Sequence, residues 1–384
     1  MTDYNSFTKK IIPASEELNS LYSQFNMRAS VARIVGDYLF VKYNYNIIKL
    51  PDYVNPKYFP TATSFKLSDL STVYNYVDEN LNTSFEFGPK YNIISKGNLI
   101  SSSPNLNDGI IPHELVNPVK LINRDILGSY SLTYSNDHKY ILWLANDAKD
   151  FKIMYAGVAS INDNGVIKNV TSFVMKSKHR AMDIQTPSLF VKKGNKYIAS
   201  IIRNESIESD DLLDFYSPYN DSKLQIWVFE DNLIKIKDSV CLRQTGISTD
   251  ITSDATRVIV GERNVYPYGC NDDESQVLLY ELTNNFRLKL LDAKEYGWRC
   301  LETCFAPNKL VVMGSRSVIK TPTQMNLLSI ANDKLQLLDT AILSENAFCF
   351  EWTQDSKFVV GAGSLLSIPE APNVLKAEID YTCK

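Results

Sequence analysis

Histidine is scarce in this chain of 384 residues, which carries only three. Histidine-type metal sites and Ser-His-Asp sets need this side chain, so we expect neither a metal site nor a catalytic residue set. The six cysteines all lie in the carboxyl-terminal half, and no two of them form a Cys-x-x-Cys pair. We therefore expect free thiols rather than zinc ligands.

The sequence also lacks segments that would direct it to or across a membrane. Its amino terminus has no basic region followed by an apolar stretch, and the longest apolar runs, such as Tyr140–Ala145, are the size of one strand. The net charge of −4 gives no global field that favours nucleic acid. Glycine-rich phosphate-binding loops are missing, so no cofactor is expected. These absences predict a cytoplasmic protein without a membrane span.

A short unit does recur along the chain. A polar turn with Asp, Asn or Gly is followed by Lys or Arg and then by a run of apolar or small residues. Aspartate and asparagine bond their own backbone in turns, and β-branched and aromatic residues suit a buried strand, so the unit predicts a hairpin. The clearest copies are 135–142, 253–260 and 353–360, and weaker copies are 35–41, 95–100, 193–199 and 306–312.

The spacing of these copies predicts the architecture. They recur about every 53 residues, and a second pair of strands with alternating apolar and polar residues follows most of them, as in 276–282 and 286–291. Four strands in a unit of this size are typical of a propeller blade. The strands after the turns are expected to begin at Tyr38, Leu99, Tyr140, Tyr197, Val258, Leu310 and Phe358.

The Ser-x-Asp-x-Lys turn before an apolar strand resembles the blade turn of WD-repeat and TolB-like β-propellers. The resemblance covers nearly the whole chain and implies a β-propeller. Together with the spacing of the copies, it leads us to expect an all-β fold, a single β-propeller with seven four-stranded blades. The Gly-His and Trp-Asp dipeptides of strict WD repeats are absent, as is the Ser-x-Asp-x-Gly-x-Thr-Trp box of sialidases. The resemblance therefore implies a fold and no particular activity.

The two chain ends are expected to meet in the last blade. That blade has sequence for three strands, at 348–352, 357–362 and 374–380, and we expect 7–12 to supply the fourth, since joining the ends protects open strand edges. Apolar residues at helical spacing from Leu18 to Phe25 predict a short helix. Residues 1–384 are thus predicted to form one propeller domain, with the closing strand and helix in 1–26 and the blades in 27–384.

Long loops between the second and third strands of each blade should open on one face, around the central channel. Binding residues concentrate in such loops. The expected loops are 45–62, 104–117, 204–222, 264–274, 317–323 and 363–372. Tyrosines offer large contact area with few rotamers, and we consider Tyr216, Tyr219, Tyr266 and Tyr268 as partner anchors, or alternatively as residues that pack on one another.

Most of the eleven arginines map to that same face. Arg124, Arg180, Arg243 and Arg299 precede or begin innermost strands, whereas Arg203, Arg263 and Arg316 lie near the ends of second strands. Guanidinium groups match carboxylate and phosphate, so together they predict a mouth that binds an acidic or phosphorylated segment. In the alternative reading, each arginine pairs with a neighbouring acid such as Glu205 or Glu262.

Three functions fit these patterns. The first is a non-enzymatic interaction platform that binds a protein partner through the tyrosines and arginines of the loop-rich face, with no nucleic acid involved. The second is a hydrolase or lactonase acting on a small molecule in the channel, for which Asp183, Asp250 and Glu351 are candidates by position. The third is a structural component of a viral or cellular assembly. We favour the first, because it requires no catalytic set.

Overall fold

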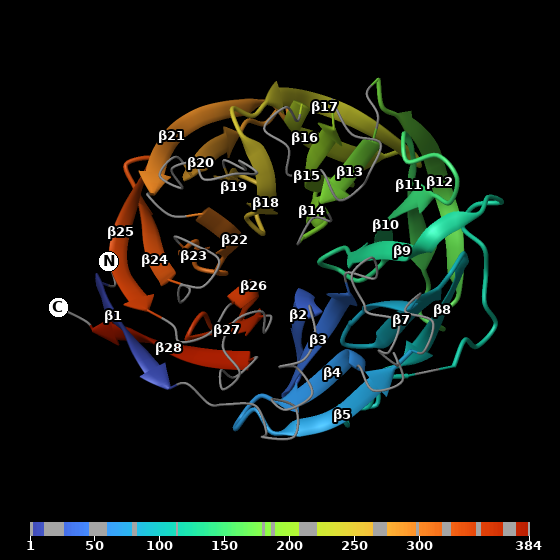
Figure 1. Cartoon of the computed structure of the whole chain (residues 1–384), viewed down its shortest axis with the longest axis horizontal. Helices are drawn as coiled ribbons and strands as arrows, with labels where there is room; N and C mark the ends of the chain where they lie inside the picture. The colour runs from blue at the N-terminus through green and yellow to red at the C-terminus, as the bar shows by residue number, and fades with distance from the viewer. Residues whose placement is uncertain are drawn as a thin grey trace, which may run out of the picture.

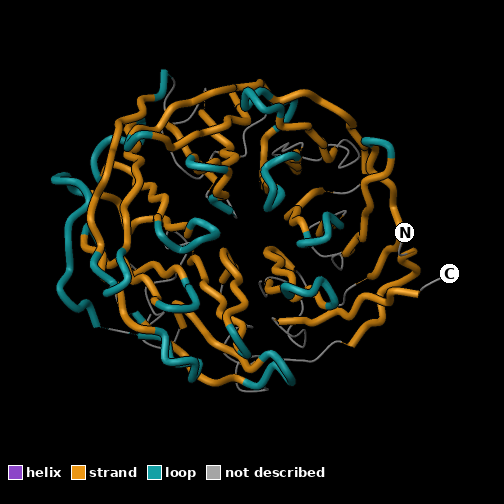
Figure 2. Tube along the Cα trace, turned by 180° about the vertical axis from the view of Figure 1, so that it is seen from behind, coloured by secondary structure: helices purple, strands orange, loops and turns teal. Residues whose placement is uncertain are grey.

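The strands of the chain are arranged in a ring around a central axis (Figure 1). The computed structural model describes residues 3–10, 27–45, 60–78, 83–112, 114–178, 181–185, 189–206, 221–263, 275–296, 299–316, 324–342, 347–363 and 374–382. These residues form strands, turns and loops, and none of them is helical (Figure 2). The helix expected between Leu18 and Phe25 lies outside the described residues.

The strands form seven antiparallel sheets, which we number along the chain. Sheet 1 contains β2 (Met27–Val35), β3 (Tyr38–Tyr45), β4 (Pro60–Lys66) and β5 (Thr72–Val77). Sheet 2 contains β6 (Thr83–Glu86), β7 (Tyr91–Lys96) and β8 (Leu99–Pro104). Sheet 3 contains β9 (Ile126–Tyr134), β10 (Tyr140–Asp147), β11 (Ile153–Ile161) and β12 (Ile167–Lys176). Sheet 4 contains β13 (Ala181–Gln185), β15 (Lys196–Ser206), β16 (Asp221–Glu230) and β17 (Leu233–Cys241), and β14 (Val191–Lys193) also pairs with β15.

The remaining three sheets complete the ring. Sheet 5 contains β18 (Thr245–Ile251), β19 (Arg257–Arg263), β20 (Ser275–Leu282) and β21 (Leu288–Tyr296). Sheet 6 contains β22 (Arg299–Phe305), β23 (Val311–Arg316), β24 (Gln324–Ala331) and β25 (Lys334–Ile342). Sheet 7 contains β26 (Ala347–Trp352), β27 (Phe358–Gly363), β28 (Val374–Thr382) and β1 (Asp3–Lys10). The strands β2, β6, β9, β13, β18, β22 and β26 each end the strand order of their sheet. They lie innermost in the ring, where β26 contacts β2 and β22, and β22 contacts β18.

The prediction of seven four-stranded blades is wrong at sheet 2. Six sheets are complete blades of four or five strands, whereas sheet 2 has three strands in the described part of the chain. The described residues between β8 and Asp125 form no regular strand, and they meet β8 at one bridge, where Ile100 and Val119 exchange backbone hydrogen bonds of 2.9 Å. Pro112 and Pro118 lie in this segment, and proline cannot donate to a strand ladder, so a regular fourth strand does not form.

Two further sequence assignments fail in the same place. Leu99 begins the third strand of its sheet rather than the second, because β6 already occupies the innermost position. The segment 104–117, expected between the second and third strands, therefore follows the third strand. It crosses towards sheet 1, where the Ser64 hydroxyl donates a hydrogen bond to the Gly109 carbonyl.

Sheet 7 joins the two ends of the chain. β1 pairs with β28 in antiparallel register from Asp3 opposite Thr382 to Lys10 opposite Lys376, and both strands lie near the marked termini in Figure 1. The expected closing strand at 7–12 is thus displaced towards the amino terminus. This pairing gives β28 a partner on its outer edge and closes the ring.

The sheets are held together by apolar side chains that alternate between two interfaces. In β10, Ile141 and Trp143 pack with residues of sheet 2, whereas Leu142 and Leu144 pack with residues of sheet 4. Successive strand residues point to opposite faces of a sheet, so an almost continuous apolar run is needed wherever both faces are covered. The run Tyr140–Ala145 is therefore a buried strand rather than an alternating one.

The recurring polar turn forms the same local bonds in sheets 3, 5 and 7. A Ser or Thr hydroxyl donates to the Asp two residues later, at 2.8 Å in Ser135–Asp137, 2.7 Å in Thr252–Asp254 and 2.6 Å in Thr353–Asp355. The residue after each Asp has a positive φ, of 57° at His138, 49° at Ala255 and 59° at Ser356. Because the aspartate fixes the turn, a residue with a Cβ adopts this left-handed conformation.

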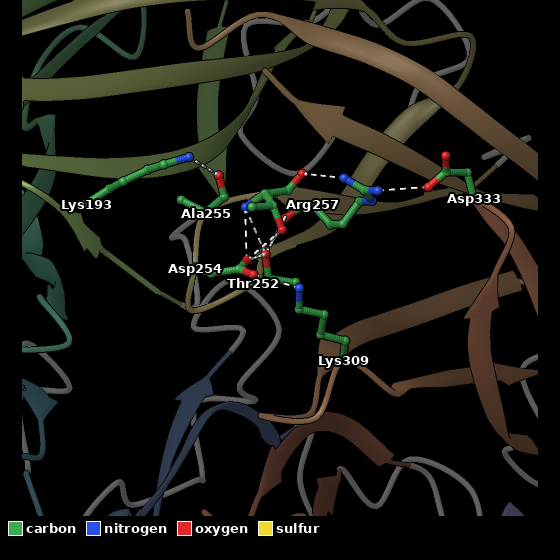
Figure 3. A network of polar contacts seen from close by, with 8 residues as sticks. Lys193, Thr252, Asp254, Ala255, Arg257, Lys309 and Asp333 are labelled. Carbon is green, nitrogen blue, oxygen red and sulfur yellow. Dashed lines mark hydrogen bonds and ion pairs between the residues drawn. The ribbon is translucent and has the colours of Figure 1, made fainter. Parts of the chain in front are cut away.

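The Asp254 turn also connects neighbouring sheets, as Figure 3 shows. The Lys309 ammonium of sheet 6 donates to Asp254 Oδ2 at 2.6 Å, and the Lys193 ammonium of sheet 4 donates to the Ala255 carbonyl at 3.2 Å. Arg257 donates to Asp333 Oδ1 at 2.8 Å. The repeated turn therefore ties three successive sheets together on the face opposite the long loops.

Replacing Asp254 with asparagine is expected to lower the free energy of unfolding at pH 7 by about 0.5–1 kcal/mol, because the pair with Lys309 is partly screened by water. Burial alone would raise the pKa of Asp254, but Lys309, Thr256 and Thr252 hold that pKa well below its usual value. A carboxyl group with a depressed folded-state pKa stabilises the fold above its unfolded pKa, so its contribution fades below about pH 4. Urea unfolding of both proteins at pH 7 and pH 3 should show the difference shrinking at pH 3, and an equal difference would contradict this role.

Candidate functional site

The described arginines of the predicted mouth have different environments. Arg203 forms an ion pair of 2.5 Å with Glu205 and donates to the Lys176 carbonyl at 3.0 Å. Arg243 is 67% exposed and lies 3.9 Å from Glu295, which is 69% exposed. Arg124 is also exposed, just before β9. Arg203 is therefore held within the protein, whereas Arg124 and Arg243 present their charges to solvent.

The remaining predicted contact residues are only partly described. Arg263 and Arg316 end the second strands β19 and β23, Arg299 begins the innermost strand β22, and Arg299 lies directly opposite Arg316 in the register. Their side chains lie outside the described part of the structure, as do Arg180, Tyr216, Tyr219, Tyr266 and Tyr268. Whether these residues bind a partner stays a prediction.

Inside the ring, Arg33 connects the innermost strands of three sheets. Its Nε donates to Glu86 Oε1 of β6 at 2.8 Å, and its Nη1 lies 3.7 Å from Glu351 Oε2 of β26. The Glu86 side chain is 2% exposed, that of Arg33 16% and that of Glu351 28%. Burial opposes the Arg33 charge, but Glu86 and Glu351 outweigh it and raise its pKa. Arg33 is therefore permanently charged at the centre of this group.

Further carboxyl groups surround Arg33. Burial, opposed by Arg33, raises the pKa of Glu351 to about 7. Burial and the nearby Asp250 raise the pKa of Glu302, on β22, to about 8. Asp250 on β18 accepts hydrogen bonds from the backbone N–H groups of Ile251 and Phe305, at 2.8 and 2.7 Å. Glu302 and Glu351 therefore retain much of their protonated form at neutral pH.

Lys42 completes this group from the second strand of sheet 1. Its ammonium donates to Ser84 Oγ of sheet 2 at 2.7 Å. Burial, opposed by Glu86, lowers the pKa of Lys42 to about 8. The bonds of Lys42 and Arg33 both run from sheet 1 to sheet 2, so these cations connect adjacent sheets.

The charged residues around Arg33 only partly match the hydrolase hypothesis. Asp250 was selected by position, but its carboxylate is engaged by two backbone N–H groups. Glu351 does face other charged groups, and Asp183 lies where side chains are not described. Sequence reasoning missed Arg33, Lys42, Glu86 and Glu302. The sequence does mark the positions of Asp250 and Glu351. Each lies two residues before the threonine that begins a recurring turn, Thr252 and Thr353 respectively.

Other expected features can be compared with the described residues. Cys241, Cys304 and Cys349 are free thiols, the last two buried. Across the described ranges, no group of His, Cys, Asp and Glu side chains is arranged to hold a metal ion. The same ranges contain no helix long and apolar enough to cross a membrane.

A groove of about 630 Å³ lies on the outer side of the ring, between sheets 5 and 6. Four consecutive residues of β21, Asp292 to Glu295, form one wall. Lys334, Leu335 and Gln336 at the start of β25 form the other, and Arg243 and Gln276 also line it. Arg243, a described mouth arginine, thus borders this groove.

Comparison with known proteins supports the fold. No family model and no curated protein matches the sequence. Among solved structures, the WD40 repeats of RRP9 superpose with a TM-score of 0.58 at 10% identity, covering 99% of this chain and 100% of that one. The structure of U3-55K gives 0.53 at 11% identity, covering 92% and 98%. The hydrazine synthase of Kuenenia stuttgartiensis gives 0.54 at 10% identity, covering 92% and 96%.

At these identities the likeness concerns the fold alone. It agrees with the closed ring of sheets and with the recurring Ser/Thr-x-Asp turns. The chain is a WD-repeat-like β-propeller, and the resemblance inferred from those turns is confirmed.

Proposed function

We propose that this propeller is a non-enzymatic interaction platform that binds a protein partner on its loop-rich face. The observation that supports the proposal is the exposure of Arg124 and Arg243, which both lie where the chain enters an innermost strand. The contact between Arg243 and Glu295 joins two largely exposed side chains at 3.9 Å, so water screens it and the guanidinium can bind another anion.

The scaffold is suited to this role. A ring closed by β1 and β28 holds the entry points of all innermost strands at fixed positions, so side chains on successive sheets can contact one extended partner. The charged residues around Arg33 fit the same function, because Arg33, Lys42 and Asp250 make bonds between sheets. In this reading they stabilise the platform and perform no reaction.

Reversing the charges of Arg124 and Lys149 tests the proposal. Lys149 is exposed in the loop between β10 and β11, on the same face as Arg124. We expect R124E/K149E to reduce recovery of the partner from a native extract about tenfold, since interfacial charge pairs become repulsive. The matched control is Lys139→Glu, an exposed residue on the opposite face, which should leave recovery unchanged.

Cross-linking of the recovered complex should place the partner against the loop-rich face. Equal recovery with R124E/K149E and K139E, or cross-links to the opposite face, would contradict the proposed surface. Failure to recover any partner from the native source would favour the structural-component reading.

A further inference from the structure

The groove between β21 and β25 is lined by more cations than anions. Arg243, Lys294 and Lys334 contribute three positive charges, against two negative charges from Asp292 and Glu295. Asp292 is already engaged, because its Oδ2 accepts the Leu335 N–H at 2.8 Å. The groove therefore carries an excess of positive charge on a protein whose net charge is negative.

The cations of the groove have weak internal partners. Lys294 donates to the Leu335 carbonyl at 3.4 Å, which is long for a hydrogen bond. Within the described residues Lys334 forms no ion pair, and the Arg243 contact with Glu295 is 3.9 Å. Since exposed ion pairs of this length contribute little, an incoming anion would not have to displace strong contacts.

The shape of the groove indicates an extended chain as its occupant. β21 is the outermost strand of sheet 5 and pairs with β20 on its inner side. Alternate residues of a strand point to opposite faces, so four consecutive lining residues mean that the groove follows the edge of β21. Protein segments bind such edges by adding a strand, and the exposed Gln336 supplies a further amide group beside it.

We propose that this groove binds an extended acidic or phosphorylated segment of a protein partner, whose anionic side chains contact Arg243, Lys294 and Lys334. The inference rests on the proposed function and names the chemistry of the partner. It extends the binding surface from the loop-rich face to the rim of the ring. A protein segment fits better than an anionic membrane, because the site is recessed between two strands and Asp292 and Glu295 line it.

The test measures peptide binding to the full chain by fluorescence anisotropy. The probe is a labelled peptide of alternating valine and glutamate with a central phosphoserine, and two reference peptides carry serine or lysine at that position. Phosphate adds charge and acceptor oxygens, so we expect the phosphoserine peptide to bind about fivefold more tightly than the serine peptide and the lysine peptide more weakly still.

Variants localise the binding. R243A/K334A should weaken binding of the phosphoserine peptide about tenfold, because both side chains contact the anion. The control is Lys289→Ala, which lies on β21 beside Glu281, is 68% exposed and does not line the groove. It should change the affinity less than about twofold. Both substitutions affect exposed residues, and matching thermal unfolding curves will verify folding.

Several outcomes would overturn the inference. These are equal binding by wild type and R243A/K334A, equal binding of the lysine peptide, and binding only to vesicles that contain anionic lipid. Competition by inorganic phosphate alone, with no preference among the peptides, would mean a simple anion site. If the groove variant keeps the native partner while R124E/K149E loses it, the groove inference fails and the platform proposal stands.

Discussion

Replacing Arg33 with methionine is expected to lower the free energy of unfolding by about 3–5 kcal/mol at pH 7.5, because it leaves Glu86 buried without its ion partner. The Arg33–Glu86 pair is 2.8 Å long and the Glu86 side chain is 2% exposed, so its carboxylate depends on this guanidinium for charge compensation. Glu351 loses its neighbouring cation as well. Urea unfolding followed by tryptophan fluorescence measures the loss.

The loss of unfolding free energy in R33M should also depend on pH. A carboxyl group whose folded-state pKa is raised costs stability as pH rises from its unfolded pKa towards the folded value. With pKa values of about 7 for Glu351 and about 8 for Glu302, stability should already fall between pH 5 and pH 8 in the wild type. Without Arg33 this fall should steepen.

The double variant R33M/E86Q provides the control. It removes both charges of the pair, so it should be more stable than R33M alone. If the free energy of unfolding of R33M at pH 7.5 lies within about 0.5 kcal/mol of the wild-type value, solvent inside the ring stabilises these charges. The structural role given to Arg33 would then be wrong.

Replacing Trp143 with alanine is expected to lower the free energy of unfolding by about 3–5 kcal/mol through lost burial and a cavity between sheets 2 and 3. The indole is fully buried and packs edge-on against Tyr130, with ring centroids 5.4 Å apart. The matched control, Leu233→Ala, alters a side chain that is 54% exposed and should change stability by less than about 0.5 kcal/mol.

Gly157 explains why this tryptophan fits. A Cβ at Gly157 would collide with the indole and with the Thr171 carbonyl of the paired strand. G157A should therefore destabilise the fold, and combining it with W143A should cost less than the sum of the two, because the ring no longer occupies the space. Strict additivity would show that the backbone contact alone accounts for the effect of G157A.

Parts of this architecture followed directly from local sequence. Ser135-Asn-Asp137 and Thr353-Gln-Asp355 encode a turn through bonds within three residues, so spacing identified those hairpins without knowledge of their neighbours. The spacing also located the turn at Thr252-Ser-Asp254. The hydroxyl that bonds to Asp254 belongs to Thr252, however, and not to Ser253, the first residue of the copy 253–260. Such turns are predictable because all their partners are nearby in the chain.

The candidate site was less predictable because its partners are distant in sequence. Arg33 and Glu86 are 53 positions apart, and the groove combines Arg243 with residues near 294 and 334. Arg203 and Arg243 were both assigned to the same mouth from the sequence, yet Arg203 is paired with Glu205 and Arg243 is exposed. Pairing of this kind depends on which side chains the ring brings together, and charge pattern alone does not specify it.

The sequence by itself determined the all-β class, the recurring hairpin and the long runs of residues that are buried on both faces. These properties depend on strand periodicity and turn chemistry, which act over a few residues. Only the tertiary structure decided that sheet 2 has three strands in the described part of the chain, and that five innermost strands bring Arg33 and four carboxyl groups together. It also decided that β21 and β25 border a groove with more cations than anions. Closure of the ring sets these contacts, because it fixes the distance between residues that the chain itself keeps far apart.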